Sequence, residues 1–285
     1  MLCTGVLTGL LLFSSVVSAV EVDLNTLPKI IRFFETNISS ASASIMVCTG
    51  VLTGLLLFSL FSSVVSAVEV DLNTLPKIIR FFETKYKPSE KTDSGEGAQY
   101  AVAINVPAEQ CGASFNENNF LSGEDTEKVK KDLSDRKTRL YRGEQMVAAR
   151  PKGSIHSERA LLICDSSQAV TPVENLLNRG EAKNGCVVFY TYNSPCLDHC
   201  LNQGKVNTKK CILDSLSILT SHPGPKAFVF SQVYRMDRDK AELASALKVV
   251  AEKVPLYKCN TNSCMKCLDN NNNFNNKCLS EGDTL

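Results

Sequence analysis

The sequence lacks an excess of either charge. It contains 31 lysines and arginines against 30 aspartates and glutamates, which gives a net charge of +1 at pH 7. A protein that binds long nucleic acid through the phosphate backbone is usually strongly basic, because its cations replace condensed counterions. The charge balance therefore argues against tight, sequence-independent binding of long DNA or RNA, while a local basic groove stays compatible with it.

Histidines and glycosylation acceptors are also scarce. The chain has 3 histidines, His156, His199 and His222, so any imidazole ligand must come from these positions. His222 precedes a proline, which predicts a surface loop. The single Asn-x-Ser/Thr acceptor is Asn37, which lies in a duplicated region, so the rest of the chain is expected to carry no N-linked glycan.

The N-terminal region repeats itself. Residues 2–36 recur almost verbatim at 47–84, and each copy runs from a methionine through an apolar stretch to Val-Ser-Ala. An apolar run that ends in small residues is typical of a secretory signal peptide, with cleavage expected after Ala67 or after Ala19. The protein is therefore expected to be secreted and extracellular.

Two signal peptides in tandem, at 1–19 and 46–67, have no evident physical purpose. We interpret them as a duplicated first exon or a mis-joined gene model, with Met46 as the working start. In the alternative, cleavage follows Ala19 and residues 51–68 remain as a hydrophobic segment. That segment is 18 residues long and rich in serine, which makes it marginal as a membrane span, so no stable membrane association is expected.

Cysteine is plentiful. The chain has 12 cysteines, two of them in the signal copies, and in an exported chain the others are expected to be oxidised unless they are protected. If two bind zinc, eight remain, an even number that allows four disulfides in a pairing that stays open. The last four contain a C-x-x-C that can bind a second metal, although disulfides are the preferred interpretation. These four are Cys259, Cys264, Cys267 and Cys278.

Apolar, β-rich runs alternate with helical patterns through the middle of the chain. The alternation predicts an α/β fold, a three-layer α/β/α domain with a mixed central sheet, stapled by disulfides. We expect an N-terminal helix and linker at 68–97, this domain at 98–257 and a Cys- and Asn-rich tail at 258–285. The expected strands are 100–106, 145–149, 187–192 and 226–234. The expected helices are 154–164, one that begins at Cys196, 211–220 and 237–254.

Two short motifs carry the chemistry. His156-x-Glu158 is followed, behind a proline, by Cys196 and Cys200. One imidazole and two thiolates are zinc ligands that leave a fourth position for water, and the metal lowers the pKa of that water toward neutrality. Glu158 is placed to move protons rather than to bind the metal.

Each motif is expected to follow a strand and to begin a helix, where exposed amides and the helix dipole favour thiolate over thiol. Three alternatives stay open. A P-C-x-x-x-C motif in an exported chain can form a disulfide. His199, inside the second motif, can replace His156 as a ligand, and Glu158 can be an ordinary carboxylate at a helix start.

These residues resemble the zinc-dependent nucleobase deaminases. His156–Glu158 matches their H-x-E motif, and Pro195–Cys200 matches their P-C…C motif. Residues 191–196 (TYNSPC) resemble the S-W-S-P-C segment of the AID/APOBEC deaminases, and residues 231–237 (SQVYRMD) lie where that family has its A-R-L-Y-Y-F/H-x-D substrate loop. With its signal peptide and many cysteines, the chain resembles secreted AID/APOBEC-like deaminases over about residues 98–255.

The resemblance implies a cytidine deaminase-like fold and hydrolytic conversion of cytosine to uracil. It implies Zn²⁺ as the cofactor and single-stranded DNA or RNA, or a cytidine-type small molecule, as the partner. An innate immune role against foreign nucleic acid follows from the resemblance alone. The implied catalytic residue is Glu158, and the implied metal ligands are His156, Cys196 and Cys200. The substrate-binding candidates are Asn105, Tyr192, Ser194, Tyr234 and Arg235.

The chain also departs from the family pattern. Three residues separate the two motif cysteines, where two are commonest in the wider superfamily, and Tyr192 and Asn193 stand where a tryptophan usually lies. Tyr234 keeps one aromatic of the substrate loop and can also be an ordinary strand-end residue, as Asn105 can be a turn residue. The second hypothesis is therefore a catalytically inactive, disulfide-rich binding protein on a deaminase scaffold, and a third is a free nucleoside deaminase.

Overall fold

The computed structural model describes residues 69–88, 99–164, 169–179, 184–202 and 211–280. The predicted signal-peptide copies at 1–19 and 46–67, and the alternative hydrophobic segment 51–68, lie outside these residues. The chain divides into two units, Met1–Ser66 and Ala67–Leu285, and the description concerns the second. Within the described residues, no helix is long and apolar enough to cross a bilayer.

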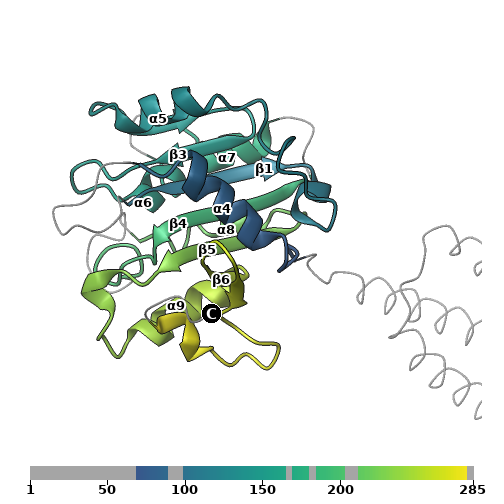
Figure 1. Cartoon of the computed structure of the whole chain (residues 1–285). Coiled ribbons are helices and arrows are strands. Elements are labelled where there is room, and N and C mark those ends of the chain that lie inside the picture. The colour runs from purple at the N-terminus through teal and green to yellow at the C-terminus, as the bar shows by residue number, and fades with distance from the viewer. Residues whose placement is uncertain (1–68, 89–98, 165–168, 180–183, 203–210, 281–285) are drawn as a thin grey trace, which may run out of the picture. The chain divides into compact units, whose positions relative to one another are not determined.

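A seven-stranded mixed sheet forms the centre of the molecule, with strand order β2-β3-β1-β4-β5-β6-β7 (Figure 1). β4 and β5 are parallel, as are β5 and β6, and the other neighbours are antiparallel. The carboxyl ends of β4 and β5 therefore lie at one edge of the sheet, beside the beginning of β1. The strands are β1 (Ala101–Val106), β2 (Leu140–Arg142), β3 (Met146–Ala149), β4 (Cys186–Asn193), β5 (Lys226–Gln232), β6 (Leu256–Cys259) and β7 (Cys264–Lys266).

Helices cover both faces of the sheet, which confirms the predicted three-layer α/β/α architecture (Figure 1). One face packs against α6 (Ser157–Leu162), α7 (Pro172–Asn178), α8 (Ser217–Thr220) and α9 (Leu243–Lys253). The other packs against α4 (Leu75–Lys85) and α5 (Thr126–Ser134). Short 3₁₀ turns are η1 (Ala108–Cys111), η3 (Arg235–Asp237) and η4 (Asn276–Leu279).

The period-two alternation of β4 divides its side chains between the two cores. Val187 and Phe189 belong to the core under α6 and α9, whereas Val188 and Tyr190 belong to the core under α4. Both sets are fully buried, which explains why this strand is a continuous apolar run. The same alternation determines on which face of the sheet each polar side chain at the carboxyl end of β4 lies.

Three predicted helices differ from the structure, and of the predicted helix 211–220 only α8, Ser217–Thr220, is helical. Residues 197–200 form a turn rather than a helix that begins at Cys196. The turn is closed by a hydrogen bond from the Leu201 N–H to the Cys196 carbonyl, a five-residue step that is wider than the α-helical one. The predicted helix 237–254 begins only at Leu243, because η3 precedes it and Asp237 binds elsewhere, as described below.

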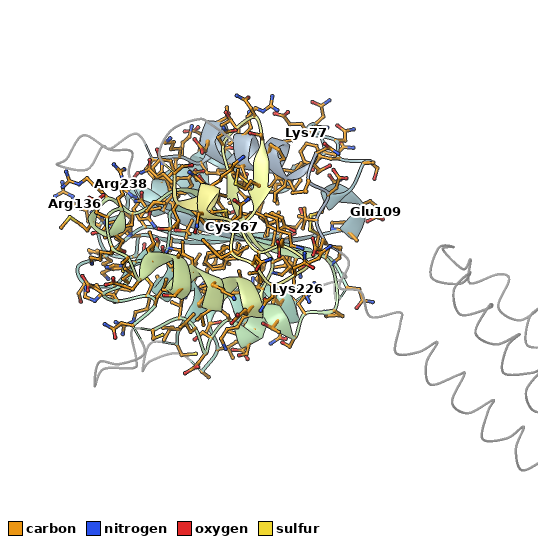
Figure 2. The ribbon with its side chains drawn as sticks, turned by 90° about the horizontal axis from the view of Figure 1, so that it is seen from below. Lys77, Glu109, Arg136, Lys226, Arg238 and Cys267 are labelled. Carbon is orange, nitrogen blue, oxygen red and sulfur yellow. A yellow bond between two sulfur atoms is a disulfide. The ribbon has the colours of Figure 1, made fainter. Side chains whose placement is uncertain are left out.

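Three disulfides are present in the described residues, where four were allowed by the count. They join Cys111 to Cys186, Cys259 to Cys264 and Cys267 to Cys278. The two cysteines of the C-x-x-C motif, Cys264 and Cys267, thus belong to two different disulfides. Cys267 is labelled in Figure 2. Cys164 and Cys211 are unpaired thiols. The C-terminal segment is disulfide-bonded as predicted, and its β7 completes the sheet.

The prediction that His222 is a surface residue is wrong. Its side chain is buried, and its Nε2 lies 2.6 Å from the Gly185 carbonyl oxygen. This contact joins the turn before β5 to the residue before β4. Burial lowers the pKa of His222, so the neutral ring that donates to the carbonyl is favoured.

Candidate metal centre

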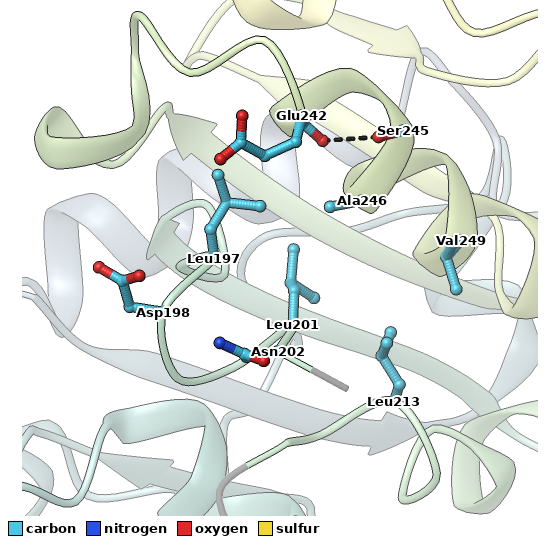
Figure 3. Close-up of a pocket in the computed structure, with 9 residues that line it drawn as sticks. All are labelled: Leu197, Asp198, Leu201, Asn202, Leu213, Glu242, Ser245, Ala246 and Val249. Carbon is cyan, nitrogen blue, oxygen red and sulfur yellow. Dashed lines mark hydrogen bonds between the residues drawn. The ribbon is translucent and has the colours of Figure 1, made fainter. Parts of the chain in front are cut away.

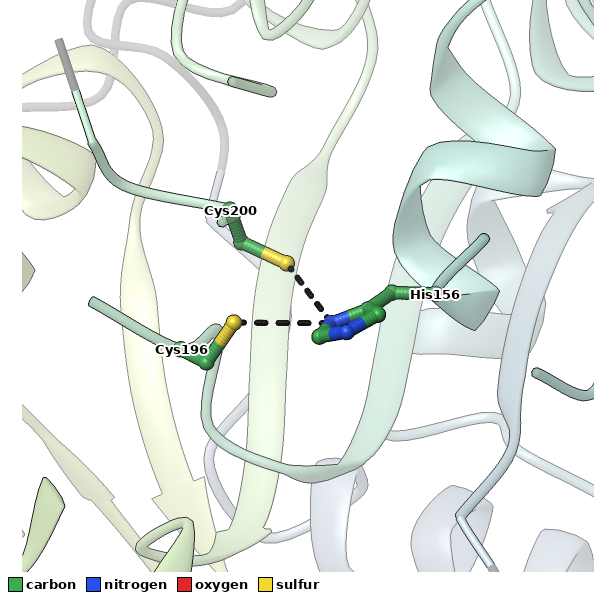
Figure 4. A group of neighbouring side chains, drawn as sticks. All are labelled: His156, Cys196 and Cys200. Atoms are coloured by element: carbon green, nitrogen blue, oxygen red, sulfur yellow. Dashed lines mark hydrogen bonds between the residues drawn. The ribbon is translucent and has the colours of Figure 1, made fainter. Parts of the chain in front are cut away.

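His156 and the two motif cysteines converge at the carboxyl edge of β4. His156 is the residue before α6, and Cys196 and Cys200 bound the turn that follows β4. The Nδ1 atom of His156 lies 3.4 Å from the Sγ of Cys196 and 3.6 Å from the Sγ of Cys200 (Figure 4). All three donor atoms lie within 4.8 Å of one another, so these residues can hold a metal ion. We call His156, Cys196 and Cys200 the metal group.

These distances fit tetrahedral zinc. Zn–S bonds of about 2.3 Å and Zn–N bonds of about 2.0–2.1 Å, at a tetrahedral angle, separate the sulfur and nitrogen ligands by about 3.6 Å. The donor set of one imidazole and two thiols also matches a catalytic site with one open position. His199 is not a member of this group. Its ring lies edge-on to that of His156, with centroids 5.0 Å apart.

Each of the two thiols affects the ionisation of the other. The pKa of Cys196 is lowered to about 4, chiefly because the Cys200 thiol donates a hydrogen bond to its sulfur, and His156 adds to the effect. The same hydrogen bond raises the pKa of Cys200. The protein surroundings alone therefore favour one thiolate, and a divalent cation is the partner that would stabilise the second.

Glu158 lies in the first turn of α6 and is 2% exposed. Its Oε1 accepts a hydrogen bond from the Thr191 hydroxyl at 2.8 Å, and its Oε2 accepts one from the Ser157 hydroxyl at 3.0 Å. Burial raises the pKa of Glu158, and the hydrogen bond from Thr191 opposes this effect. A buried carboxyl with a raised pKa beside candidate metal ligands is suited to taking up and releasing protons during a reaction.

Gln99, which the sequence analysis did not single out, also hydrogen-bonds to Glu158 and Thr191. The Gln99 side-chain amide donates to Glu158 Oε1 at 3.1 Å and to the Thr191 hydroxyl at 2.8 Å. Gln99 directly precedes the predicted first strand, and its position before that strand was the only signal in the sequence. Its hydrogen-bonding partners lie 58 to 94 positions away in sequence, so no local pattern reveals them.

Residues 231–237, which resemble the substrate loop, pack against the turn that is bounded by Cys196 and Cys200. We call this turn the ligand turn. The Ser194 hydroxyl accepts a hydrogen bond from the Tyr234 N–H at 3.0 Å. The buried Asp237 accepts one from the Leu197 N–H at 2.9 Å. Tyr234 is half-buried, and burial raises its pKa, followed by the charge of Cys196. Two of the substrate-binding candidates, Ser194 and Tyr234, are thus joined close to Cys196, and the exposed Arg235 follows Tyr234 in the chain.

Two other candidates lie elsewhere. Tyr192 projects to the α4 face, one residue out of phase with Thr191, where its ring stacks on Tyr100 at 6.2 Å and lies under Lys87 Nζ at 4.3 Å. Asn105 pairs with Val187, at the opposite end of β4 from Thr191. At about 3.3 Å per residue, four residues place it about 13 Å along the strand from the site. The structure brings neither side chain to the metal group.

A hollow of about 390 Å³ lies beside the ligand turn (Figure 3). The turn contributes Leu197, Asp198 and Leu201, and α9 contributes Ala246 and Val249. Its lining contains none of the three candidate metal ligands and not Glu158. This hollow is therefore separate from the chemical centre.

Comparison with known proteins places the chain in a family. No curated protein and no solved structure gives a significant match. The family model described as Secreted Novel AID/APOBEC-like Deaminase 1 matches residues 73–282, a span that contains the sheet, both motifs and all three disulfides. The chain therefore belongs to the Secreted Novel AID/APOBEC-like Deaminase 1 family.

Proposed function

We propose that this protein is a secreted, zinc-dependent hydrolytic deaminase that converts cytosine to uracil. The observation that carries the proposal is the convergence of His156, Cys196 and Cys200 with the buried carboxyl of Glu158 two residues from the histidine. A purely structural zinc site has four protein ligands. A site with three ligands beside a buried carboxyl is suited to chemistry on a bound substrate.

The roles of the residues follow from their positions. His156, Cys196 and Cys200 hold zinc, which when bound supplies the Lewis acidity that activates a water molecule for attack on C4 of cytosine. Glu158 would accept the first proton of that water and deliver it to the ring nitrogen, and would then carry the second proton, from the hydroxyl group added at C4, to the leaving amine. Water and cytosine are consumed, and uracil and ammonia are released.

The substrate is proposed to be a cytosine in single-stranded DNA or RNA, or a cytidine-type small molecule. The net charge of +1 supports a short or unpaired substrate over a long duplex. A base inside a duplex would in any case have to be extruded to reach the buried Glu158. Tyr234, held near the metal group by Ser194, is the candidate that would stack on the base.

The test begins with the purified secreted protein. We expect about one zinc per chain, and four thiols from the described domain after unfolding with a chelator, namely Cys164, Cys196, Cys200 and Cys211. Absence of zinc together with only two thiols would mean that the motif cysteines are joined in a disulfide, which would overturn the proposed metal site.

Activity is then measured on cytidine and on short DNA and RNA strands that contain cytosine, with Glu158→Gln as the matched control. We expect deamination by the zinc-loaded protein and a rate about 10²–10⁴-fold lower for the variant, at equal zinc content. A zinc-loaded, folded protein that deaminates none of the three substrates would contradict the proposal and favour a binding protein on a deaminase scaffold.

A further inference from the structure

We propose that Gln99 is a positioning residue that orients the Glu158 carboxylate for proton transfer. This role rests on the proposed deaminase function of the site. Gln99 lies outside both motifs, two residues before β1, and its half-buried side chain contacts groups of α6 and β4. The side-chain amide of Gln99 has four hydrogen-bonding neighbours, which fix its orientation.

The orientation of the amide is set by a backbone group. The Asn193 N–H donates to Gln99 Oε1 at 2.9 Å. An N–H group cannot accept a hydrogen bond, so the oxygen of the amide must face Asn193. The NH₂ group is thereby directed at Glu158, Thr191 and Ser157, at 3.1, 2.8 and 3.1 Å respectively.

Proton counting shows why this amide controls Glu158. The Thr191 hydroxyl has one proton and two nearby acceptors, Glu158 Oε1 and the Asn193 carbonyl oxygen. Because Gln99 donates to the Thr191 oxygen, that oxygen serves as acceptor and keeps its own proton to donate. Gln99 therefore acts on the carboxylate twice, by its own N–H and by directing the Thr191 hydroxyl.

The same contacts join the two chemical motifs. Ser157 and Glu158 belong to α6, whereas Thr191 and Asn193 belong to β4, which leads into the ligand turn. A side chain that binds both segments fixes the carboxyl group relative to the strand end that precedes Cys196. Partners of this kind, one step removed from the reacting groups, are typically worth 10–100-fold in activity or metal affinity.

Two substitutions separate positioning from simple structural support. Gln99→Glu keeps an oxygen that accepts from the Asn193 N–H but removes the NH₂ donor. Gln99→Met keeps the length of the side chain and removes both functions. Gln145→Met is the matched control, because Gln145 lies at the far end of β1, where its carbonyl accepts from the Asn105 N–H.

We expect both Gln99 variants to lower kcat for cytosine deamination by about 10–100-fold, with KM and zinc content close to those of the wild type and of Gln145→Met. In a Glu158→Ala background, Gln99→Met should change the residual rate no further, since its effect passes through the carboxylate. A wild-type kcat in Gln99→Glu, or an equal further loss in the Glu158→Ala background, would overturn the inference.

A crystallographic comparison keeps the inference testable if the proposed function fails. Should the zinc-loaded wild type deaminate no substrate, the zinc-loaded structures of wild type and Gln99→Met are compared. Displacement of the Glu158 carboxylate, with His156, Cys196 and Cys200 unmoved, supports the positioning role. An unmoved carboxylate refutes it. Thermal unfolding identifies a variant that does not fold, and Thr191→Val, which removes the relayed hydroxyl alone, then takes its place with the same expected loss of kcat.

Discussion

Removal of the disulfide between Cys111 and Cys186 is predicted to be the most destabilising of the three possible disulfide deletions. The bond ties η1 to the first residue of β4, and both cysteines are buried. Its two ends are 75 residues apart in sequence, against 5 for the pair Cys259 and Cys264. A cross-link restricts the unfolded chain more when it closes a longer loop.

The magnitude follows from the loop lengths. The chain-entropy relation gives about 4.5 kcal/mol for the long loop and about 2 kcal/mol for the short one. For a domain of this size, 1 kcal/mol corresponds to roughly 2–4 °C in Tm. The double variant Cys111→Ala/Cys186→Ala should therefore melt about 9–18 °C below the wild type, and Cys259→Ala/Cys264→Ala about 4–8 °C below it.

Thermal and urea unfolding under non-reducing conditions measure both losses, with zinc content determined for each folded sample. Zinc per folded chain should stay unchanged, because neither pair belongs to the metal group. Equal losses for the two pairs, or a larger loss for the short loop, would refute the loop-closure argument. Loss of zinc from the folded long-loop variant would instead show that the disulfide supports the position of β4.

Three further predictions concern buried polar groups. Glu158→Gln should lower kcat by about 10²–10⁴-fold and yet raise Tm, because burial raises the pKa of this carboxyl and so disfavours its charged form; a lower Tm would contradict this. The pKa of His222 is lowered by burial, so its contribution to stability is present above pH 6.5 and lost as the pH falls below it, at up to about 1.4 kcal/mol per pH unit. Urea midpoints of His222→Gln should therefore depend less on pH between 7 and 5, and an identical dependence would count against the argument. Asp237→Ala, which removes the acceptor for Leu197 N–H, should weaken zinc affinity by about 10–100-fold in chelator competition, whereas unchanged affinity would show that the turn holds without it.

The long apolar strands and the short strand β3 were predictable, whereas β2, β6 and β7 were not. The centres of β4 and β5 are buried on both faces of the sheet, so each strand contains a continuous apolar run, at 187–190 and 227–230. β2 has 3 residues and β7 has 3 residues, too few to show a period. β2 becomes a strand because it pairs with β3, and β7 because it pairs with β6. These pairings form only when the chain folds.

The ligand turn shows a similar limit. A proline followed by cysteine after a strand is compatible with a helix start, yet residues 197–200 form a turn. Asp237, 40 residues away in sequence, accepts the Leu197 N–H that a helix would leave exposed at its first turn. This contact forms only when residues 231–237 pack against the ligand turn. Local helix propensity therefore cannot predict it.

The sequence by itself determined the chemical identity of the centre. Imidazole, thiol and carboxyl groups have intrinsic metal-binding and proton-transfer chemistry, so His156, Cys196, Cys200 and Glu158 could be named from residue type, order and spacing. Only the tertiary structure decided which other residues reach them. Strand register and alternation carry Tyr192 and Asn105 away from the centre and bring Gln99 to it, because pairing between distant segments fixes which end and which face of the sheet a side chain occupies.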